Sequence, residues 1–277
     1  MSAVSALRGM VSFFTLWHLD ITQEDIDSME DGFHLVPAVG LVFGSISMLL
    51  MAVLFLFGER TDTYTGMLAA AACLLTAYIG SKFIHFDGLT DFGDGMIVSG
   101  KREDHIRALK DTLVGAGGIG VALAVTLASF SVYSAWNVPL LIILAPAAEI
   151  MVKNAMVFAA AFGLPSNGMA GRQVSKTTGK SAAKSVIVSA LCAAGISAVS
   201  GWIYCSLTGE QEIIVPLTIT LLSGLAVSCI AGWIMAKAAN RTFGFVNGDI
   251  LGATNEICRP LAVFAMGAVF LVIRWTL

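Results

Sequence analysis

Seven long apolar runs limit this chain to folds that cross a membrane. A helix needs about 20 mostly apolar residues to span a bilayer. The seven runs cover approximately residues 35–57, 64–84, 112–135, 138–162, 183–207, 213–238 and 259–277. Residues 3–17 form an eighth stretch, too short to span, that we expect to lie along the interface or to pack against the bundle. The prediction is one all-α polytopic integral membrane domain over residues 1–277, a bundle of about seven transmembrane helices.

The composition agrees with this class. The chain is 57% hydrophobic and 13% charged, with a mean hydropathy of +0.83, whereas a soluble domain carries about 25% charged residues. Its net charge of −3 gives no reason to expect a nucleic-acid partner. The five cysteines show no CxxC spacing, so neither a zinc site nor a disulfide framework is indicated.

The lysines and arginines orient the predicted bundle. Cytoplasmic loops of membrane proteins are enriched in these residues. If the N-terminus is inside, 13 of the 16 basic residues fall in or beside the inner segments 1–34, 85–111, 163–182 and 239–258. Because the polar motifs lie in the same segments, we expect a multi-pass protein of the cell (inner) membrane with its active site on the cytoplasmic face.

An aspartate cluster follows the second apolar run. Asp87, Asp91 and Asp94 fall at i, i+4 and i+7, so they share one face of a helix. Hard oxygen ligands suit Mg²⁺, with Mn²⁺ as the alternative. A solvated acidic helix end would carry the same residues, but these stand among apolar neighbours. The spacing predicts a metal site for phosphate chemistry; His85 is a ligand, a donor behind a ligand, or an interfacial histidine.

Basic residues beyond the cluster are candidates for phosphate binding. Arg102 suits a bidentate phosphate clamp, and it equally suits a positive loop that faces anionic lipid. Lys110 and Asp111 are better candidates, because they precede a glycine-rich helix start that also permits close helix packing. Arg172 lies in the glycine- and serine-rich stretch 163–180, which is either a flap over an anionic ligand or an ordinary flexible loop, and the composition slightly favours the loop.

Further ionisable residues lie in or beside the later runs. Asp249 and Glu256 stand seven residues apart, and we expect them to reach the same face as Asp87 as metal ligands or as a general base. The alternative is an acidic helix start that stabilises its dipole. Glu149 and Lys153, at i and i+4 in the fourth run, are expected to pair with each other or to line a polar cavity. The acidic segment 20–31, which precedes the first run, is expected to be a solvated linker, with partner binding as the alternative.

These motifs resemble the cobalamin synthase family, which is also named adenosylcobinamide-GDP ribazoletransferase. The resemblance rests on His85-x-Asp87-Gly88-x-x-Asp91-x-x-Asp94-Gly95, Lys110-Asp111-x-x-x-Gly115 and Asn247-Gly248-Asp249-x-x-Gly252-Ala253-x-x-Glu256. The chain length, the number of spans and an early Pro37-x-x-Gly40-x-x-x-Gly44 helix also fit. The chain departs from the family pattern at Lys153, where the middle span often has an arginine.

The resemblance implies a transferase that completes the nucleotide loop of vitamin B12. Adenosylcobinamide-GDP would bind through its diphosphate to Mg²⁺ held by Asp87, Asp91 and Asp94. A hydroxyl of α-ribazole, or of its 5′-phosphate, would then displace GMP, with Asp249 accepting the proton and Asp94 or Glu256 as alternatives. The candidate substrate-binding residues are His85, Arg102, Lys110, Asp111, Lys153, Arg172 and Asn247.

Two other functions would also account for part of these motifs. A CDP-alcohol phosphatidyltransferase also uses aspartates and a diphosphate-linked donor, but its usual Ala-Arg pair is missing after Asp87-Gly88. A divalent-cation transporter would need ionisable groups near mid-membrane and on both faces, whereas the acids here gather on one face. The sequence leaves open whether the protein forms a homo-oligomer.

Overall fold

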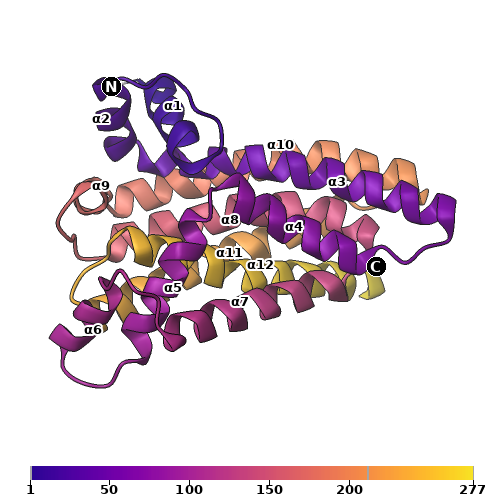
Figure 1. The fold of residues 1–277 in the computed structure, drawn as a ribbon. Helices are drawn as coiled ribbons and strands as arrows, with labels where there is room; N and C mark the ends of the chain where they lie inside the picture. The colour runs from indigo at the N-terminus through magenta and orange to yellow at the C-terminus, as the bar shows by residue number, and fades with distance from the viewer. Residues whose placement is uncertain (1, 211, 277) are drawn as a thin grey trace.

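The computed structural model describes residues 2–210 and 212–276, and every regular element in them is a helix (Figure 1). Six helices are long and apolar enough to cross a membrane, and a bent pair makes a seventh span if it is counted as one. This confirms the predicted all-α polytopic bundle. Leu277, the expected last residue of the final span, lies outside the described residues.

The elements follow one another in the order shown by the colours of Figure 1. Their bounds are α1 (Ala3–Phe14), α2 (Gln23–Asp31), the 3₁₀ helix η1 (Phe33–Val39), α3 (Gly40–Thr61), α4 (Gly66–Gly80), α5 (Ile84–Ile97), α6 (Arg102–Leu109), α7 (Ala116–Ala135), α8 (Val138–Phe162), α9 (Met169–Lys176), α10 (Gly179–Thr208), α11 (Ile214–Thr242) and α12 (Gly248–Thr276).

Helix α8 is the centre of the bundle. It contacts α3, α10, α11 and α12, and its apolar window is entirely buried. Asn137 begins the helix, because its side chain accepts a hydrogen bond from the Leu140 amide at 2.9 Å. The surrounding spans expose apolar side chains such as Leu191 and Leu222, as expected of helices that face lipid. Any polar side chain on α8 must therefore find its partners inside the protein.

The second apolar run ends earlier than expected. The predicted span over residues 64–84 forms α4 only as far as Gly80, and α5 leaves it at an angle of 91°. Lys82 and Phe83, which connect the two helices, both adopt left-handed backbone conformations with φ of 55° and 58°. The chain therefore turns sideways and carries the aspartate cluster across the bundle (Figure 1).

The last span begins earlier than expected. Helix α12 starts at Gly248, whereas the hydropathy pattern places the start near residue 259. The intervening turns contain Asn255 and Glu256, which lower the local hydropathy but are buried and hydrogen-bonded inside the bundle. Asp249 consequently lies in the first turn of a long helix.

The N-terminal helices fold over one end of the bundle. Helix α1 packs against α2 and η1, which confirms the prediction of a short packed N-terminal helix. Helix α2 starts with a capping box formed by Thr22 and Asp25. Glu30, near its end, is buried and forms ion pairs with Arg172 at 2.8 Å and Lys176 at 3.1 Å in α9. The expected solvated linker is therefore wrong: the segment is a helix held by buried and charged contacts.

Candidate active site

Close packing of α5 against α12 brings distant acids together. A Cβ atom at Gly88 would lie 2.7 Å from the backbone oxygen of Asp249, and one at Gly252 would lie 3.1 Å from the Cα of His85. Only glycine permits two backbones to approach this closely. Asp249 and Asp87 consequently border the same cavity. We call Asp87, Asp91, Asp94 and Asp249 the acidic group.

Asp94 holds the start of α7. The amides of Gly115 and Gly118 donate to its two carboxylate oxygens, each at 2.7 Å. These donors are among the unpaired amides that every helix start presents. A Cβ atom at Gly118 would lie 2.5 Å from the backbone oxygen of Thr90, so this glycine serves close helix packing. Each carboxylate oxygen keeps a second lone pair that can reach a cation.

The acidic group has no close counter-charge in the described part of the chain. No basic side chain there comes within 4.0 Å of its four carboxylates. Such an excess of negative charge and hard oxygen atoms fits a divalent cation. Among the described residues, no three acidic, histidine or cysteine side chains already converge at metal-ligand distance, so a cation would draw them together.

Asn247 positions Asp249. Its amide nitrogen Nδ2 donates to Asp249 Oδ2 at 2.6 Å, and its oxygen Oδ1 accepts from the amide of Ile250 at 3.1 Å. The second bond is the usual contact of a residue that caps a helix N-terminus. Asn247 therefore both begins α12 and orients the carboxylate beside the other acids.

The candidates in and after α6, which are Arg102, Lys110 and Asp111, make different contacts. The Lys110 ammonium lies 5.5 Å from the centre of the Phe245 ring, in the segment that leads into Asn247 and Asp249. Arg102 instead donates to the backbone oxygen of Arg241 at 3.2 Å and links α6 to the end of α11. Asp111 lines a shallow hollow of about 280 Å³ together with Asp94.

Arg172 holds α9 against the N-terminal helices. Its guanidinium donates to Glu30 at 2.8 Å, and Lys176 also contacts Asp31 at 3.0 Å. These carboxylates, together with their hydrogen bonds, raise the pKa of Lys176 above its usual value. The stretch 163–180 therefore contains a helix that is tied to α2, and Met169 and Ala170 of that helix border the same cavity as Asp87 and Asp249.

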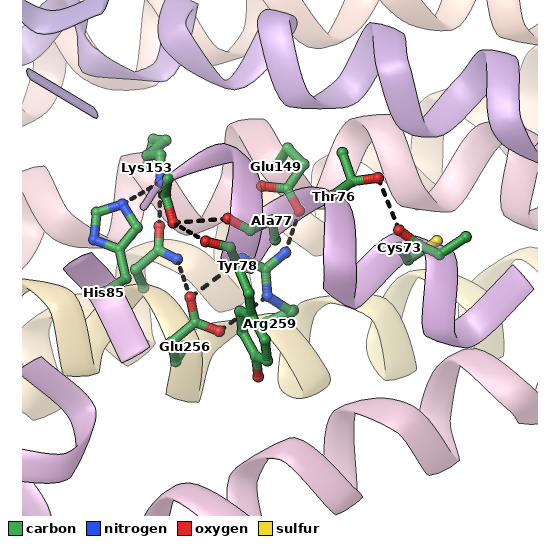
Figure 2. A network of polar contacts seen from close by, with 12 residues as sticks. Cys73, Thr76, Ala77, Tyr78, His85, Glu149, Lys153, Glu256 and Arg259 are labelled. Carbon is green, nitrogen blue, oxygen red and sulfur yellow. Dashed lines mark hydrogen bonds and ion pairs between the residues drawn. The ribbon is translucent and has the colours of Figure 1, made fainter. Parts of the chain in front are cut away.

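A buried polar network links α5, α8 and α12, and Figure 2 shows His85, Lys153, Glu149, Glu256 and Arg259 within it. Lys153 lies 2.8 Å from His85 Nε2 and donates to Asn255 Oδ1 at 2.7 Å; Asn255 in turn donates to Glu256 Oε1 at 2.8 Å. Because an ammonium can only donate, the Nε2 of His85 accepts and its proton resides on Nδ1. Glu256 is therefore hydrogen-bonded inside this network, away from the acidic group.

Arg259 completes the network. Its guanidinium contacts Glu149 on α8 and lies 3.3 Å from Glu256 on its own helix. The expected pair between Glu149 and Lys153 does not form, because α12 and α5 supply other partners for both residues. All of these side chains are buried, and their charges balance, as a low-dielectric interior requires.

Three hollows border Asp87, and one of them, of about 530 Å³, lies between α1 and the turn at Lys82 and Phe83. A cavity of about 230 Å³ lies under α1, α2 and α9 and is bordered by His85, Asp87 and Asp249. A groove of about 590 Å³ lies on the other side, where Tyr78 and Phe86 face α7. Asp87 therefore borders several separate spaces, which suits a reaction between two substrates.

Comparison with known proteins adds an independent finding. The family described as "Cobalamin-5-phosphate synthase" matches residues 6–267. A Methanocella arvoryzae protein named "Adenosylcobinamide-GDP ribazoletransferase" is 32% identical over 275 residues, 96% of each chain. Proteins of the same name from Methanosarcina mazei and Halorubrum lacusprofundi are each 28% identical; the second alignment covers 99% of this chain and 98% of its relative. The chain belongs to the cobalamin-5-phosphate synthase family. No solved structure matches it.

Membership of the cobalamin-5-phosphate synthase family agrees with the resemblance seen in the sequence and not with the phosphatidyltransferase or transporter alternatives. Sequence spacing did not predict the ion pairs of Glu30 and Arg259, nor the place of Gln173 in the wall of the cavity that Asp87 borders. An arginine directly before Pro260 in an apolar run could have marked Arg259, because a buried charge requires a partner. Gln173 carries no comparable signal, since a single amide in a short helix has no spacing to compare.

Proposed function

We propose that this protein is an adenosylcobinamide-GDP ribazoletransferase of cobalamin biosynthesis. It joins adenosylcobinamide-GDP to α-ribazole, or to α-ribazole 5′-phosphate, and releases GMP. The observation that carries the proposal is the family match over residues 6–267, which contains every member of the acidic group. A membrane protein with a cytoplasmic active site fits the location of these residues at the end of the bundle that carries most basic residues.

The acidic group would hold the divalent cation of this reaction. Asp87, Asp91 and Asp94 are the proposed ligands of Mg²⁺, or of Mn²⁺, and their oxygen atoms suit either ion. When bound, the cation would neutralise the charge of the donor diphosphate. Lys110 supports the proposal because it is a basic side chain that packs on Phe245, just before Asn247 and Asp249. Arg102 and Asp111 stay proposed substrate-binding residues: Asp111 borders a hollow together with Asp94, whereas the backbone oxygen of Arg241 holds Arg102.

Asp249 is the proposed proton acceptor. A hydroxyl oxygen of the acceptor attacks the phosphorus nearer cobinamide, and the bond from that phosphorus to the bridging oxygen of GMP breaks. Asp249 takes the proton of the attacking hydroxyl, while Asn247 keeps its carboxylate oriented through the 2.6 Å bond. Asp94 is the alternative. Glu256 is a weaker candidate because Arg259 and Asn255 already occupy its oxygens.

The remaining substrate-binding candidates border the cavity under α1, α2 and α9, contact a residue of its wall, or belong to a helix that covers it. His85 borders the cavity, and Lys153 fixes its tautomer through the 2.8 Å contact. Arg172 acts through α9, which covers the same cavity. Lipid surrounds the spans.

The test is GMP release by purified full-length protein in lipid vesicles. We expect release only when adenosylcobinamide-GDP, α-ribazole and Mg²⁺ are all present, and loss of release on chelation. Asp87→Asn and Asp91→Asn should lower kcat by roughly 100-fold or more. Asp62→Asn is the matched control, since Asp62 is exposed in the link between α3 and α4. Activity of Asp91→Asn within a few-fold of wild type would contradict the metal role.

A further inference from the structure

The cavity beside Asp87 has a chemical character that the acidic group does not explain. Its walls are mostly apolar, with Phe13 and Phe14 from α1, Met29 from α2 and Met169 from α9. Phe14 stacks on His85 with ring centres 5.6 Å apart. At about 230 Å³ it lies below the roughly 300–1,000 Å³ of ordinary ligand pockets. Such a space fits one flat ring system and is far too small for a corrinoid.

One polar group in the cavity wall lacks a partner. Gln173 borders the cavity and is 6% exposed, and its amide nitrogen Nε2 has no hydrogen-bond partner among the described residues. A buried donor without an acceptor is costly, and buried amide groups are therefore nearly always paired. A bound molecule that supplies one acceptor would remove this cost.

The acceptor substrate has the matching chemistry. The base of α-ribazole is a benzimidazole, a flat and largely apolar bicycle with one free ring nitrogen that accepts a hydrogen bond. Guanine of the donor fits poorly, since its several donors and acceptors would remain unpaired against phenylalanine and methionine side chains. Asp87 and Asp249 border the same cavity, so the ribose attached to a base held there would face the acidic group.

We propose that this cavity binds the benzimidazole base of the acceptor, with the Gln173 amide turning to donate its Nε2 to the free ring nitrogen. The inference rests on the proposed function and adds the place and the specificity of the acceptor. Helices α1, α2 and α9 then form a cover whose apolar side chains select the base. The ion pairs of Glu30 with Arg172 and Lys176 hold that cover together.

The first experiment removes one hydrogen-bonding partner at a time. Wild-type protein and Gln173→Leu are compared with α-ribazole and with the riboside of the corresponding indole, which has a C–H in place of the free nitrogen. We expect wild type to prefer α-ribazole by about tenfold or more in kcat/KM, and Gln173→Leu to lose this preference. The KM for adenosylcobinamide-GDP should not change in either protein. Gln23→Leu, at an exposed position of α2, is the matched control and should keep the preference.

A second experiment tests the size of the site. Ala170→Leu places a larger side chain in the cavity wall, whereas Leu123→Trp fills the groove on the other side of Asp87. Ala170→Leu should raise the KM for α-ribazole about tenfold or more, and the smaller imidazole riboside should be used almost as well as by wild type. Leu123→Trp should not alter the choice of base.

Three results separate the failures. If Gln173→Leu discriminates between the two ribosides as wild type does, the base is not held by Gln173. If Leu123→Trp rather than Ala170→Leu changes the choice of base, the acceptor lies in the groove and the inference is overturned. If wild-type protein releases no GMP from adenosylcobinamide-GDP with any acceptor, the proposed function fails, and the placement of the base fails with it.

Discussion

Arg259 is the residue on which the charge balance of the interior depends. It is 1% exposed and lies between Glu149 of α8 and Glu256 of α12 (Figure 2). Removing one partner of such a group leaves an uncompensated buried charge, which costs far more than the loss of an exposed pair. The network that links α5, α8 and α12 should therefore be sensitive to single substitutions.

Arg259→Met should destabilise the protein by about 3–5 kcal/mol, because it leaves the carboxylates of Glu149 and Glu256 buried without their cation. Arg274→Met is the matched control: Arg274 pairs with Glu210, and both side chains are about one-third exposed. That change should cost at most about 1 kcal/mol. Thermal unfolding in detergent measures both. Equal losses of stability would contradict the importance assigned to burial.

Spacing along the sequence correctly placed some residues on one helix face, but it predicted the wrong partners for others. Asp87, Asp91 and Asp94 could be recognised because a helical face depends only on residues along one segment. The same reasoning joined Glu149 to Lys153 through their i, i+4 spacing, but α12 brings Arg259 to the glutamate and Asn255 to the lysine. Partners from another helix depend on packing, which spacing along one helix does not contain.

The contact between α5 and α12 needs glycine at Gly88. An added methyl group would lie 2.7 Å from the backbone oxygen of Asp249, so the helices must separate. Gly88→Ala should lower kcat by about 100-fold, since displacement of a reacting group by about 1 Å has an effect of that size. Gly120→Ala is the control, because nothing lies within 4 Å of the added carbon there. Steady-state GMP release measures both variants, and a fully active Gly88→Ala would refute the argument.

The attachment of α2 to α9 should depend on Glu30. Glu30→Gln should weaken the attachment by about 1 kcal/mol, a modest value because Arg172 and Lys176 are partly exposed. Hydrogen exchange of the α2 amides should then be faster, whereas Glu24→Gln, at an exposed position of the same helix, should leave it unchanged. Unaltered exchange in Glu30→Gln would speak against these pairs.

The pH dependence of the same attachment follows from Lys176. The pKa of Lys176 is raised in the folded protein. The stabilisation that its ion pairs give to the attachment of α2 is therefore complete below the ordinary pKa of lysine. It is lost as the pH rises through the raised pKa. Exchange in α2 should therefore stay slow at neutral pH after correction for intrinsic rates.

Helix positions were predictable where hydropathy decided them and not where backbone conformation or internal pairing did. The turn after Gly80 rests on left-handed conformations at Lys82 and Phe83, neither of which is a glycine that would have marked it. The start of α12 was placed too late because Asn255 and Glu256 look unfavourable in lipid until their partners are known.

Different segments of the chain lie at the two ends of the bundle. In Figure 1, α6, α9 and the N-terminal helices lie at one end, while the link between α3 and α4 and the C-terminus lie at the other. Ser99, after α5, and Thr63, between α3 and α4, are both exposed and belong to opposite ends. They are suitable reporters of orientation.

Single cysteines at these positions should be labelled from opposite sides of the membrane. In a background without the native cysteines, a membrane-impermeant maleimide should modify Thr63→Cys in intact cells and Ser99→Cys only in inverted vesicles. This follows from the enrichment of basic residues in cytoplasmic segments. The opposite pattern would place the acidic group outside the cell.

The turn of 91° between α4 and α5 determines at what depth the chemistry takes place. An aspartate row along an upright helix would descend into the bilayer by about 1.5 Å per residue. Because α5 instead crosses the bundle, its acids lie side by side at nearly one level. A bulky substrate and a smaller one can therefore approach the same plane from two directions, and the departing nucleotide need not pass through hydrocarbon.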